Sequence, residues 1–333
     1  MTNPVLVEVL RGGRVESRHG GSIAVCDAHG GIFLARGDVA RPVFPRSAVK
    51  VIQALPLVES GAADAFDFDR KELALACASH SGETEHAALA RKILAKAGFE
   101  PDALECGVHW PSSQEATIEL ARSGGTASAL HNNCSGKHSG FLCACRHLGL
   151  NHKGYVKIGH DYQRLIAATM EEVTGAAHRE DNSGTDGCSI PTYAVPLTNL
   201  ATGFAKLATG EGLAAERAKA ARRLFSACMA EPFYVAGTGR ADTAMMTAGN
   251  GRVFVKVGAE GVYCGAVPEL GLGFALKIDD GAGRGAEAAV ASLLAWLLRA
   301  DEALAARYAG MASVTMKNWN GIEVGAVRGL PLS

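Results

Sequence analysis

The sequence PRSAVK, residues 45–50, places the hydroxyl of Ser47 and the amine of Lys50 three residues apart. We expect a helix from Ser47 to about Val58, with a kink at Pro56. If it begins near Ser47, positions i and i+3 share one face and the two side chains can meet. A lysine that is desolvated, or crowded by another cation, loses its proton more readily and can activate a serine. This Ser-x-x-Lys arrangement is typical of some acyl-transfer enzymes. About one such spacing is expected by chance in a chain of this composition, so other segments must support it.

Strands are predicted at both ends of the chain, with helices between them. Paired glycines separate the apolar runs near the N-terminus, and residues 252–257 and 262–267 form the clearest hairpin. We therefore predict an α+β fold, in which a mainly antiparallel sheet is covered by helices. The sheet should come from about residues 1–36 and 250–330, and the helical middle from about residues 47–248, within one domain spanning residues 1–333.

A late strand carries a second lysine. Serine acyl-transfer enzymes with Ser-x-x-Lys have the same general layout and place Lys-Thr-Gly or Lys-Ser-Gly on such a strand. In this chain the corresponding residues are Lys256, Val257 and Gly258, and no Ser-Asp-Asn triplet occurs. Since Val257 lacks a hydroxyl, the usual penicillin-recognising set is incomplete, which disfavours β-lactam chemistry.

Composition excludes several functional classes. Hydrophobic residues make up 48% of the 333, and the formal net charge is -1 with no basic block, so nucleic acid and anionic membranes are not expected partners. No secretory signal or membrane-spanning run is recognised, and we expect a soluble, cytoplasmic protein. The nine cysteines lack a dense framework and should be reduced thiols, some of them possible metal ligands. No glycine pattern typical of a nucleotide site is found.

Three polar stretches interrupt the helical middle, at residues 79–83, 131–138 and 181–191. Each precedes or joins apolar segments, and loops in such positions often carry function. Ordinary helix capping would also account for serine and asparagine there, and the local sequence leaves that alternative open.

Five segments, residues 45–50, 79–83, 131–138, 184–192 and 256–265, together resemble the rhizobial-type L-asparaginases, also called the asparaginase II or class 3 group. The resemblance covers nearly the whole chain. It implies a fold like that of serine β-lactamases and glutaminases, a homodimer, and hydrolysis of L-asparagine to L-aspartate and ammonia. It also implies two Ser–Lys tandems, Ser47 with Lys50 and Ser79 with Lys256.

The resemblance further implies a zinc site with Cys134, Lys137 and Cys188 as ligands. Thiolates suit zinc, whereas the lysine must lose its proton to bind. Spacing alone does not predict this site, because a Cys-x-x-Lys pair and a distant cysteine are more often buried thiols and a solvated amine.

The expected mechanism begins with attack of Ser47, deprotonated by Lys50, on the side-chain amide carbon. Ser79 and Lys256 would relay protons and keep Lys50 neutral, although the choice of Ser47 or Ser79 as nucleophile stays open. The α-carboxylate and α-amine of the substrate need one group of each sign, for which Arg46, His138 and Asp186 are candidates. A structural ion pair is the alternative for these residues.

Two other functions compete with this prediction. One is another serine acyl-transfer hydrolase, such as a glutaminase or a β-lactamase-like enzyme. The other is a non-catalytic, zinc-binding amino-acid sensor, which has no need of two buried amines beside serines. Lys50 and Lys256 therefore argue against the sensor.

Overall fold

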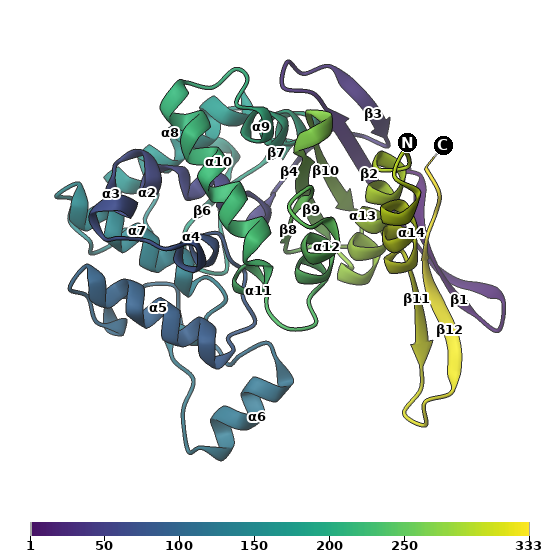
Figure 1. Cartoon of the computed structure of the whole chain (residues 1–333), viewed down its shortest axis with the longest axis horizontal. Coiled ribbons are helices and arrows are strands. Elements are labelled where there is room, and N and C mark those ends of the chain that lie inside the picture. Colours follow the sequence, from purple (N-terminus) through teal and green to yellow (C-terminus); the bar gives the residue numbers. More distant parts are fainter. Residues whose placement is uncertain (1, 333) are drawn as a thin grey trace.

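A computed structural model describes residues 2–332 of the chain (Figure 1). Within them, eight strands form one antiparallel sheet in the order β11-β12-β1-β2-β10-β9-β8, with β3 also paired to β2. These strands are β1 (Val5–Arg11), β2 (Arg14–Cys26), β3 (Ile32–Arg36), β8 (Phe254–Gly258), β9 (Val262–Val267), β10 (Leu272–Ile278), β11 (Ser313–Lys317) and β12 (Glu323–Gly329). The sheet is thus built from both ends of the chain, and β1 pairs directly with β12. The predicted α+β arrangement with a mainly antiparallel sheet is confirmed.

Helices and short turns occupy the middle of the chain and the segment before β11. The α-helices are α1 (Lys50–Gln53), α2 (Leu55–Glu59), α3 (Ala62–Ala65), α4 (Arg70–Ala76), α5 (Thr84–Lys96), α6 (Gln114–Arg122), α7 (Ser135–His147), α8 (Asp161–Thr174), α9 (Leu197–Thr209), α10 (Ala215–Ala230), α11 (Pro232–Val235), α12 (Ala241–Gly249), α13 (Gly283–Leu297) and α14 (Glu302–Met311). The 3-10 turns are η1 (Arg46–Val49), η2 (Pro101–Ala103), η3 (Ala129–His131), η4 (Glu180–Asn182) and η5 (Pro268–Leu270). Two small sheets pair β4 (Pro42–Val43) with β7 (Val195–Pro196) and β5 (Ser183–Thr185) with β6 (Pro191–Tyr193).

Both faces of the large sheet are covered. Cys26 of β2 is paired with Gly273 of β10, whose Cβ would meet the Ala201 carbonyl oxygen of α9. In contrast, His19 of β2 lies where a Cβ on Gly285 of α13 would point. Residues an odd number apart along a strand face opposite sides of the sheet, so α9 and α13 cover opposite faces. Helix α14 packs against α13, whereas α8 and α10 pack against α9 (Figure 1).

The N-terminal glycines act differently from the prediction. Gly20 and Gly21 were expected to separate two strands, yet both lie inside β2, so the predicted break is wrong. A Cβ on Gly21 would come within 2.3 Å of the Lys277 carbonyl oxygen on the neighbouring strand. Gly21 is therefore suited to a close approach between strands and not to a turn.

The segment after Pro45 is broken into short pieces. We expected one helix over residues 47–58, with a kink at Pro56, whereas η1, α1 and α2 follow one another separately. Arg46 has a φ of 52°, in the left-handed region, and the Ala48 N–H donates to the Pro45 carbonyl at 3.0 Å. This tight turn directs Lys50 into the interior, where its side chain is fully buried.

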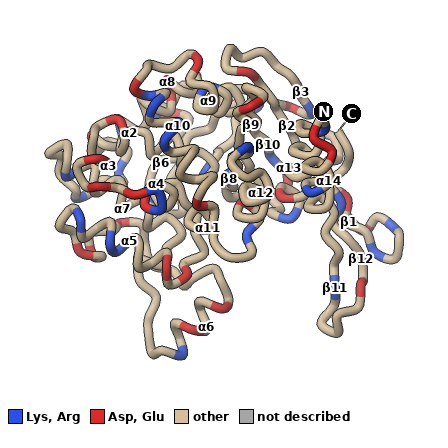
Figure 2. The backbone as a smooth tube through the Cα atoms, viewed as in Figure 1, with Lys and Arg blue, Asp and Glu red and all other residues tan. Residues whose placement is uncertain are grey.

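Charged residues are scattered along the backbone tube of Figure 2, with acidic and basic positions interspersed. Within the described part of the chain, no helix has the length and apolar character needed to cross a bilayer.

We predict that Gly258→Ala destabilises the fold. Gly258 ends β8 against the turn that carries Lys50, and a Cβ there would come within 2.3 Å of the Pro45 carbonyl oxygen. Because the Pro45 oxygen belongs to the backbone, the clash can be relieved only by a shift of the turn. This shift should lower the free energy of unfolding by about 1–3 kcal/mol. Denaturant unfolding measures this loss.

Gly310→Ala is the matched control, because that glycine lies in α14 and no neighbouring atom comes within 4 Å of the point that its Cβ would occupy. It should be neutral or slightly stabilising. Equal stability of both variants would show that the contact between Gly258 and Pro45 imposes no constraint.

Candidate active site

Ser79 lies between two buried lysine amines. Its Oγ is 2.9 Å from Lys50 Nζ and 2.9 Å from Lys256 Nζ. Lys50 comes from the start of α1, Lys256 from the middle of β8, and Ser79 from the segment after α4. The Ser79 N–H donates to the Val235 carbonyl at 2.9 Å, which fixes its backbone. Three segments distant in sequence therefore meet at one hydroxyl.

The two amines differ in their hydrogen-bond partners. Lys50 Nζ lies within reach of three acceptors: the Ala78 carbonyl oxygen at 2.5 Å, Ser79 Oγ at 2.9 Å and Cys134 Sγ at 3.0 Å. These match the three donors of an ammonium. Lys256 Nζ has two partners, Ser79 Oγ and the Val257 carbonyl oxygen at 3.0 Å. A neutral amine at Lys256 can donate to Val257 and accept the Ser79 hydroxyl proton.

The electrostatic surroundings favour that assignment. Burial lowers the pKa of Lys256 to about 7, and the positive charges of Lys50 and Arg240 act in the same direction, against the opposing charges of Asp242 and Cys134. A substantial fraction of Lys256 is therefore unprotonated near neutral pH. It can act as a base toward Ser79.

Ser47 is placed differently from the expected tandem. Its side chain is partly exposed, and across residues 2–332 no hydrogen bond joins its hydroxyl to Lys50 or to another group. The 3-10 geometry of η1 directs the Lys50 amine inward, toward Ala78 and Ser79, instead of along the surface of a regular helix. The attacking role of Ser47 stays a prediction.

The three residues proposed as zinc ligands lie together. Lys137 Nζ is 3.1 Å from Cys188 Sγ, and the Cys188 thiol hydrogen-bonds Cys134. That hydrogen bond, with the nearby charges of Lys50 and Lys137, lowers the pKa of Cys134 well below its ordinary value despite burial. The pKa of Cys188 is raised correspondingly, so one negative charge is held mainly by Cys134.

Two thiolate sulfurs suit zinc, whereas a lysine amine lies outside its usual Cys, His, Asp and Glu ligands. No group of three or more His, Cys, Asp or Glu side chains arranged to hold a metal ion is found between residues 2 and 332. The third donor would therefore have to be Lys137. Burial lowers its pKa, but the charges of Cys188, Cys134 and Asp186 outweigh burial and raise it, so a metal ion would have to displace its proton.

Arg46 and Asp186 form an ion pair at the edge of this cluster. Arg46 Nε is 2.7 Å from Asp186 Oδ1, and the Gly187 N–H donates to the same oxygen at 2.7 Å. Burial raises the pKa of Asp186, yet Lys137 and Arg46 together lower it below its ordinary value. Both side chains are partly accessible, with 26% and 11% exposed, so a charged ligand can reach the pair.

His138 is fully buried beside Tyr155. His138 Nδ1 lies 2.7 Å from the Tyr155 hydroxyl, which also accepts a hydrogen bond from the Glu105 N–H at 2.9 Å. The Nε2 atom of His138 has no partner among the described residues. Burial and the charges of Lys137 and Lys50 hold the pKa of His138 well below its ordinary value.

The polar stretch 131–138 is not the solvated loop that its sequence suggests. Ser135, Lys137 and His138 belong to the first turn of α7 and are buried. Each has a hydrogen-bond partner, His80 for Ser135, Cys188 for Lys137 and Tyr155 for His138, which offsets the cost of placing polar groups inside.

Sequence reasoning missed His80, the residue after Ser79. Its N–H donates to the Asn133 carbonyl at 3.2 Å, its Nδ1 accepts from the Gly82 N–H at 3.1 Å, and its Nε2 lies 2.9 Å from Ser135 Oγ. His80 therefore connects the Ser79 segment to the turn that carries Cys134. Its adjacency to Ser79 was the only signal in the sequence.

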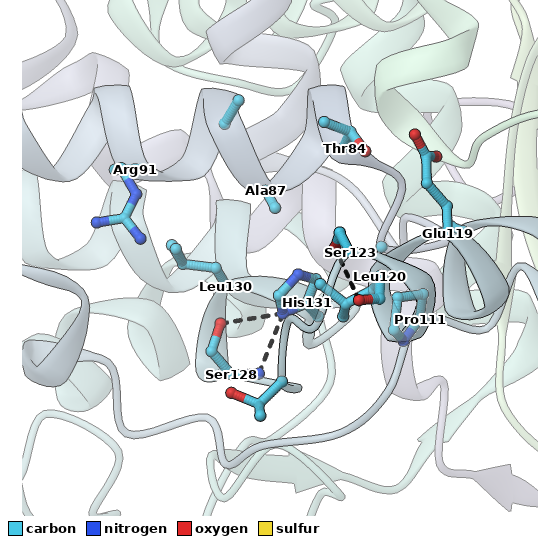
Figure 3. Close-up of a pocket in the computed structure, with 14 residues that line it drawn as sticks. Thr84, Ala87, Arg91, Pro111, Glu119, Leu120, Ser123, Ser128, Leu130 and His131 are labelled. Carbon is cyan, nitrogen blue, oxygen red and sulfur yellow. Dashed lines mark hydrogen bonds between the residues drawn. The ribbon is translucent and has the colours of Figure 1, made fainter.

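A separate cavity of about 540 Å³ lies between α5 and α6 (Figure 3). Its lining includes Thr84, Arg91, Glu119 and His131, and none of the residues predicted for the site lines it. Gly82 connects its wall to the Ser79 segment. Its lining contains neither of the serine–lysine contacts described above.

Comparisons with known proteins identify the family. A search of curated proteins finds no match. Among solved structures, a β-lactamase from Mycobacterium bovis is similar, with 15% sequence identity, a TM-score of 0.40, and coverage of 86% of this chain and 94% of that chain. The profile of the family described as L-asparaginase II matches residues 7–329, almost the full length, in agreement with the resemblance noted from the five motifs. The chain therefore belongs to the L-asparaginase II family.

Proposed function

We propose that this protein hydrolyses L-asparagine to L-aspartate and ammonia through a serine nucleophile activated by lysine. Membership of the L-asparaginase II family supports an amidohydrolase. The observation that carries the serine mechanism is the position of Ser79 Oγ, 2.9 Å from each of two buried amines. A serine in this position has both a base and a cation at its hydroxyl.

The contacts favour Ser79 over Ser47 as the attacking residue. Lys256, with its lowered pKa, accepts the Ser79 proton, while the Lys50 ammonium stabilises the negative charge that develops on Ser79 Oγ. Ser47 is the second candidate, because its side chain is more exposed than that of Ser79. In that case Ser79 and Lys256 would relay its proton, as the sequence first suggested.

The reaction then follows two steps. Ser79 Oγ bonds to the side-chain amide carbon, the C–N bond breaks, and the proton held by Lys256 passes to the departing nitrogen, which leaves as ammonia. Water next attacks the resulting ester, gives its proton to Lys256, and releases aspartate. The proton on Lys256 returns to Ser79 Oγ, which restores the starting state.

The substrate is a zwitterion and needs one partner of each sign. Arg46 is suited to the α-carboxylate and Asp186 to the α-amine, and their ion pair holds both groups ready in a partly accessible position. Nε2 of His138, which has no partner among the described residues, is a further polar group for a bound molecule.

Cys134, Lys137 and Cys188 would hold a zinc ion. When bound there, zinc would supply a Lewis acid that polarises a carbonyl oxygen. The nucleophile does not depend on it, because the Ser–Lys contacts already provide one. A homodimer is part of the same proposal and rests on the family resemblance.

We predict that the purified protein releases ammonia from L-asparagine and that Ser79→Ala lowers kcat/KM by about a thousandfold or more, because the nucleophile is lost. Ser47→Ala should cost far less. A coupled ammonia assay measures both, with L-glutamine and a β-lactam as comparison substrates.

Preference for glutamine or for the β-lactam would favour the other serine acyl-transfer hydrolases. Binding of asparagine without ammonia release would favour the sensor. If Ser47→Ala abolishes activity and Ser79→Ala retains it, Ser47 is the nucleophile after all.

The pH dependence follows from Lys256. Its unprotonated form is the active base, so kcat/KM for L-asparagine should rise with pH through a midpoint of about 7 and then level off. Lys256→Met should remove this limb together with most of the activity. A rate that is flat from about pH 5 to about pH 9 would contradict Lys256 as the base.

Zinc content is predicted to depend on the two cysteines. Protein purified without chelator should contain about one zinc per chain, and Cys134→Ala or Cys188→Ala should remove most of it. Elemental analysis measures the content. Cys145→Ala, which changes a buried thiol of α7 outside the cluster, is the control and should retain zinc. A wild-type protein with only traces of zinc would remove the metal from the mechanism.

A further inference from the structure

Asp242 braces the strand that carries Lys256. It lies in the first turn of α12 and is fully buried. Its Oδ1 accepts a hydrogen bond from the Val257 N–H at 2.7 Å, and its Oδ2 accepts one from the Tyr263 hydroxyl at 3.0 Å. Val257 and Tyr263 face each other across β8 and β9. One carboxylate therefore clamps both strands directly beside Lys256.

An uncharged side chain at position 242 could make part of the same hydrogen-bond arrangement. A buried carboxylate is costly to place inside a protein unless the surroundings use its charge. The proton transfer proposed above creates a new positive charge on Lys256, which has no solvent exposure. Such a charge needs an opposite charge nearby, and Asp242 is the carboxylate positioned to supply it.

Several groups face Lys256, among them the thiols of Cys264, its partner on β9, and Cys228 on α10, whose pKa values are both raised above the ordinary value chiefly by burial or by a neighbouring thiol. Asp242 on α12 and Cys134 before α7 favour its ammonium, whereas Lys50 on α1 and Arg240 before α12 disfavour it. Burial has the largest effect and lowers the pKa of Lys256, and Asp242 is the strongest of the charges that act on it. Without the carboxylate of Asp242, burial and the positive charges of Lys50 and Arg240 would disfavour the protonated form of Lys256.

We propose that Asp242 is a positioning residue for Lys256: it holds β8 through Val257 and supplies the negative charge facing the ammonium formed when Lys256 takes the Ser79 proton. In this step the Oγ–H bond of Ser79 breaks, the N–H bond on Lys256 forms, and the Oγ electron pair bonds to the substrate carbon. The inference rests on the proposed function of Lys256 as base. Asp242 touches neither Ser79 nor the substrate and acts through Lys256 alone.

The test compares four variants by the pH profile of kcat/KM for L-asparagine. Asp242→Asn keeps the shape and removes the charge, so the rising limb should move to lower pH by about one unit and the plateau should fall about tenfold, because Lys256 becomes a weaker base. Arg240→Gln removes a cation and should move the limb to higher pH. Tyr263→Phe removes one hydrogen bond without changing charge and should leave the limb in place.

Asp242→Glu keeps the charge and is the second check if Asp242→Asn fails to fold. Its limb should stay at the wild-type pH, even if the plateau falls because the Val257 contact is disturbed. The proposal is overturned if the rising limb of Asp242→Glu moves to lower pH. It is also overturned if folded Asp242→Asn keeps its limb at the wild-type pH. A purely structural role would lower the plateau of Asp242→Asn and Tyr263→Phe alike without moving either limb.

A titration without substrate separates this inference from the proposed function. The ¹³Cε resonance of Lys256, assigned by its loss in Lys256→Met, reports the protonation of the amine directly in lysine-labelled protein. It should titrate at lower pH in Asp242→Asn than in wild type. If that shift occurs while the wild type releases no ammonia from asparagine, the proposed function fails and the link between Asp242 and Lys256 survives. If ammonia is released but the resonance does not shift, the link fails alone.

Discussion

The burial of lysine amines is the constraint on which the rest of the site depends. Lys50, Lys137 and Lys256 are each at most 1% exposed, and a buried cation is very unfavourable without partners. The chain supplies those partners from distant segments: the Ala78 carbonyl and Ser79 for Lys50, Cys188 for Lys137, and the Val257 carbonyl with Ser79 for Lys256. The polar stretches 79–83 and 131–138 are largely buried, and they supply Ser79 and Cys134 as partners of Lys50.

The three amines are given different electrostatic surroundings, and this difference gives them different roles. Lys137 lies among negative groups that raise its pKa, so it is a counter-charge or, after losing its proton, a metal ligand. Lys256 lies where burial and two cations lower its pKa to about 7, which suits the role of base proposed for it. Lys50 has three acceptors at its amine, which suits the oxyanion-stabilising role proposed for it. The same residue type can therefore serve three purposes within one cluster.

Much of the fold was predictable because its signals are local. The hairpin of β8 and β9 follows from two apolar runs and the intervening glycine, and Gly261 has the positive φ that such a turn requires. Helix α8 ends at Gly175, also with positive φ, as predicted from the glycine position. Gly20 and Gly21 misled the prediction because glycine also permits close approach between strands, and that use depends on a neighbour far away in sequence.

The sequence by itself determined which chemical groups are present: the serines, the three lysines, the two cysteines and the order of motifs that marks the family. It also indicated an antiparallel sheet built from both ends, since period-two patterns and turn residues act over short distances. Only the tertiary structure decided that Lys50 reaches Ser79 and not Ser47, and that Asp242 lies beside the Lys256 strand. Hydrogen bonds and desolvation depend on which groups are adjacent in space, and a chain position alone does not contain that information.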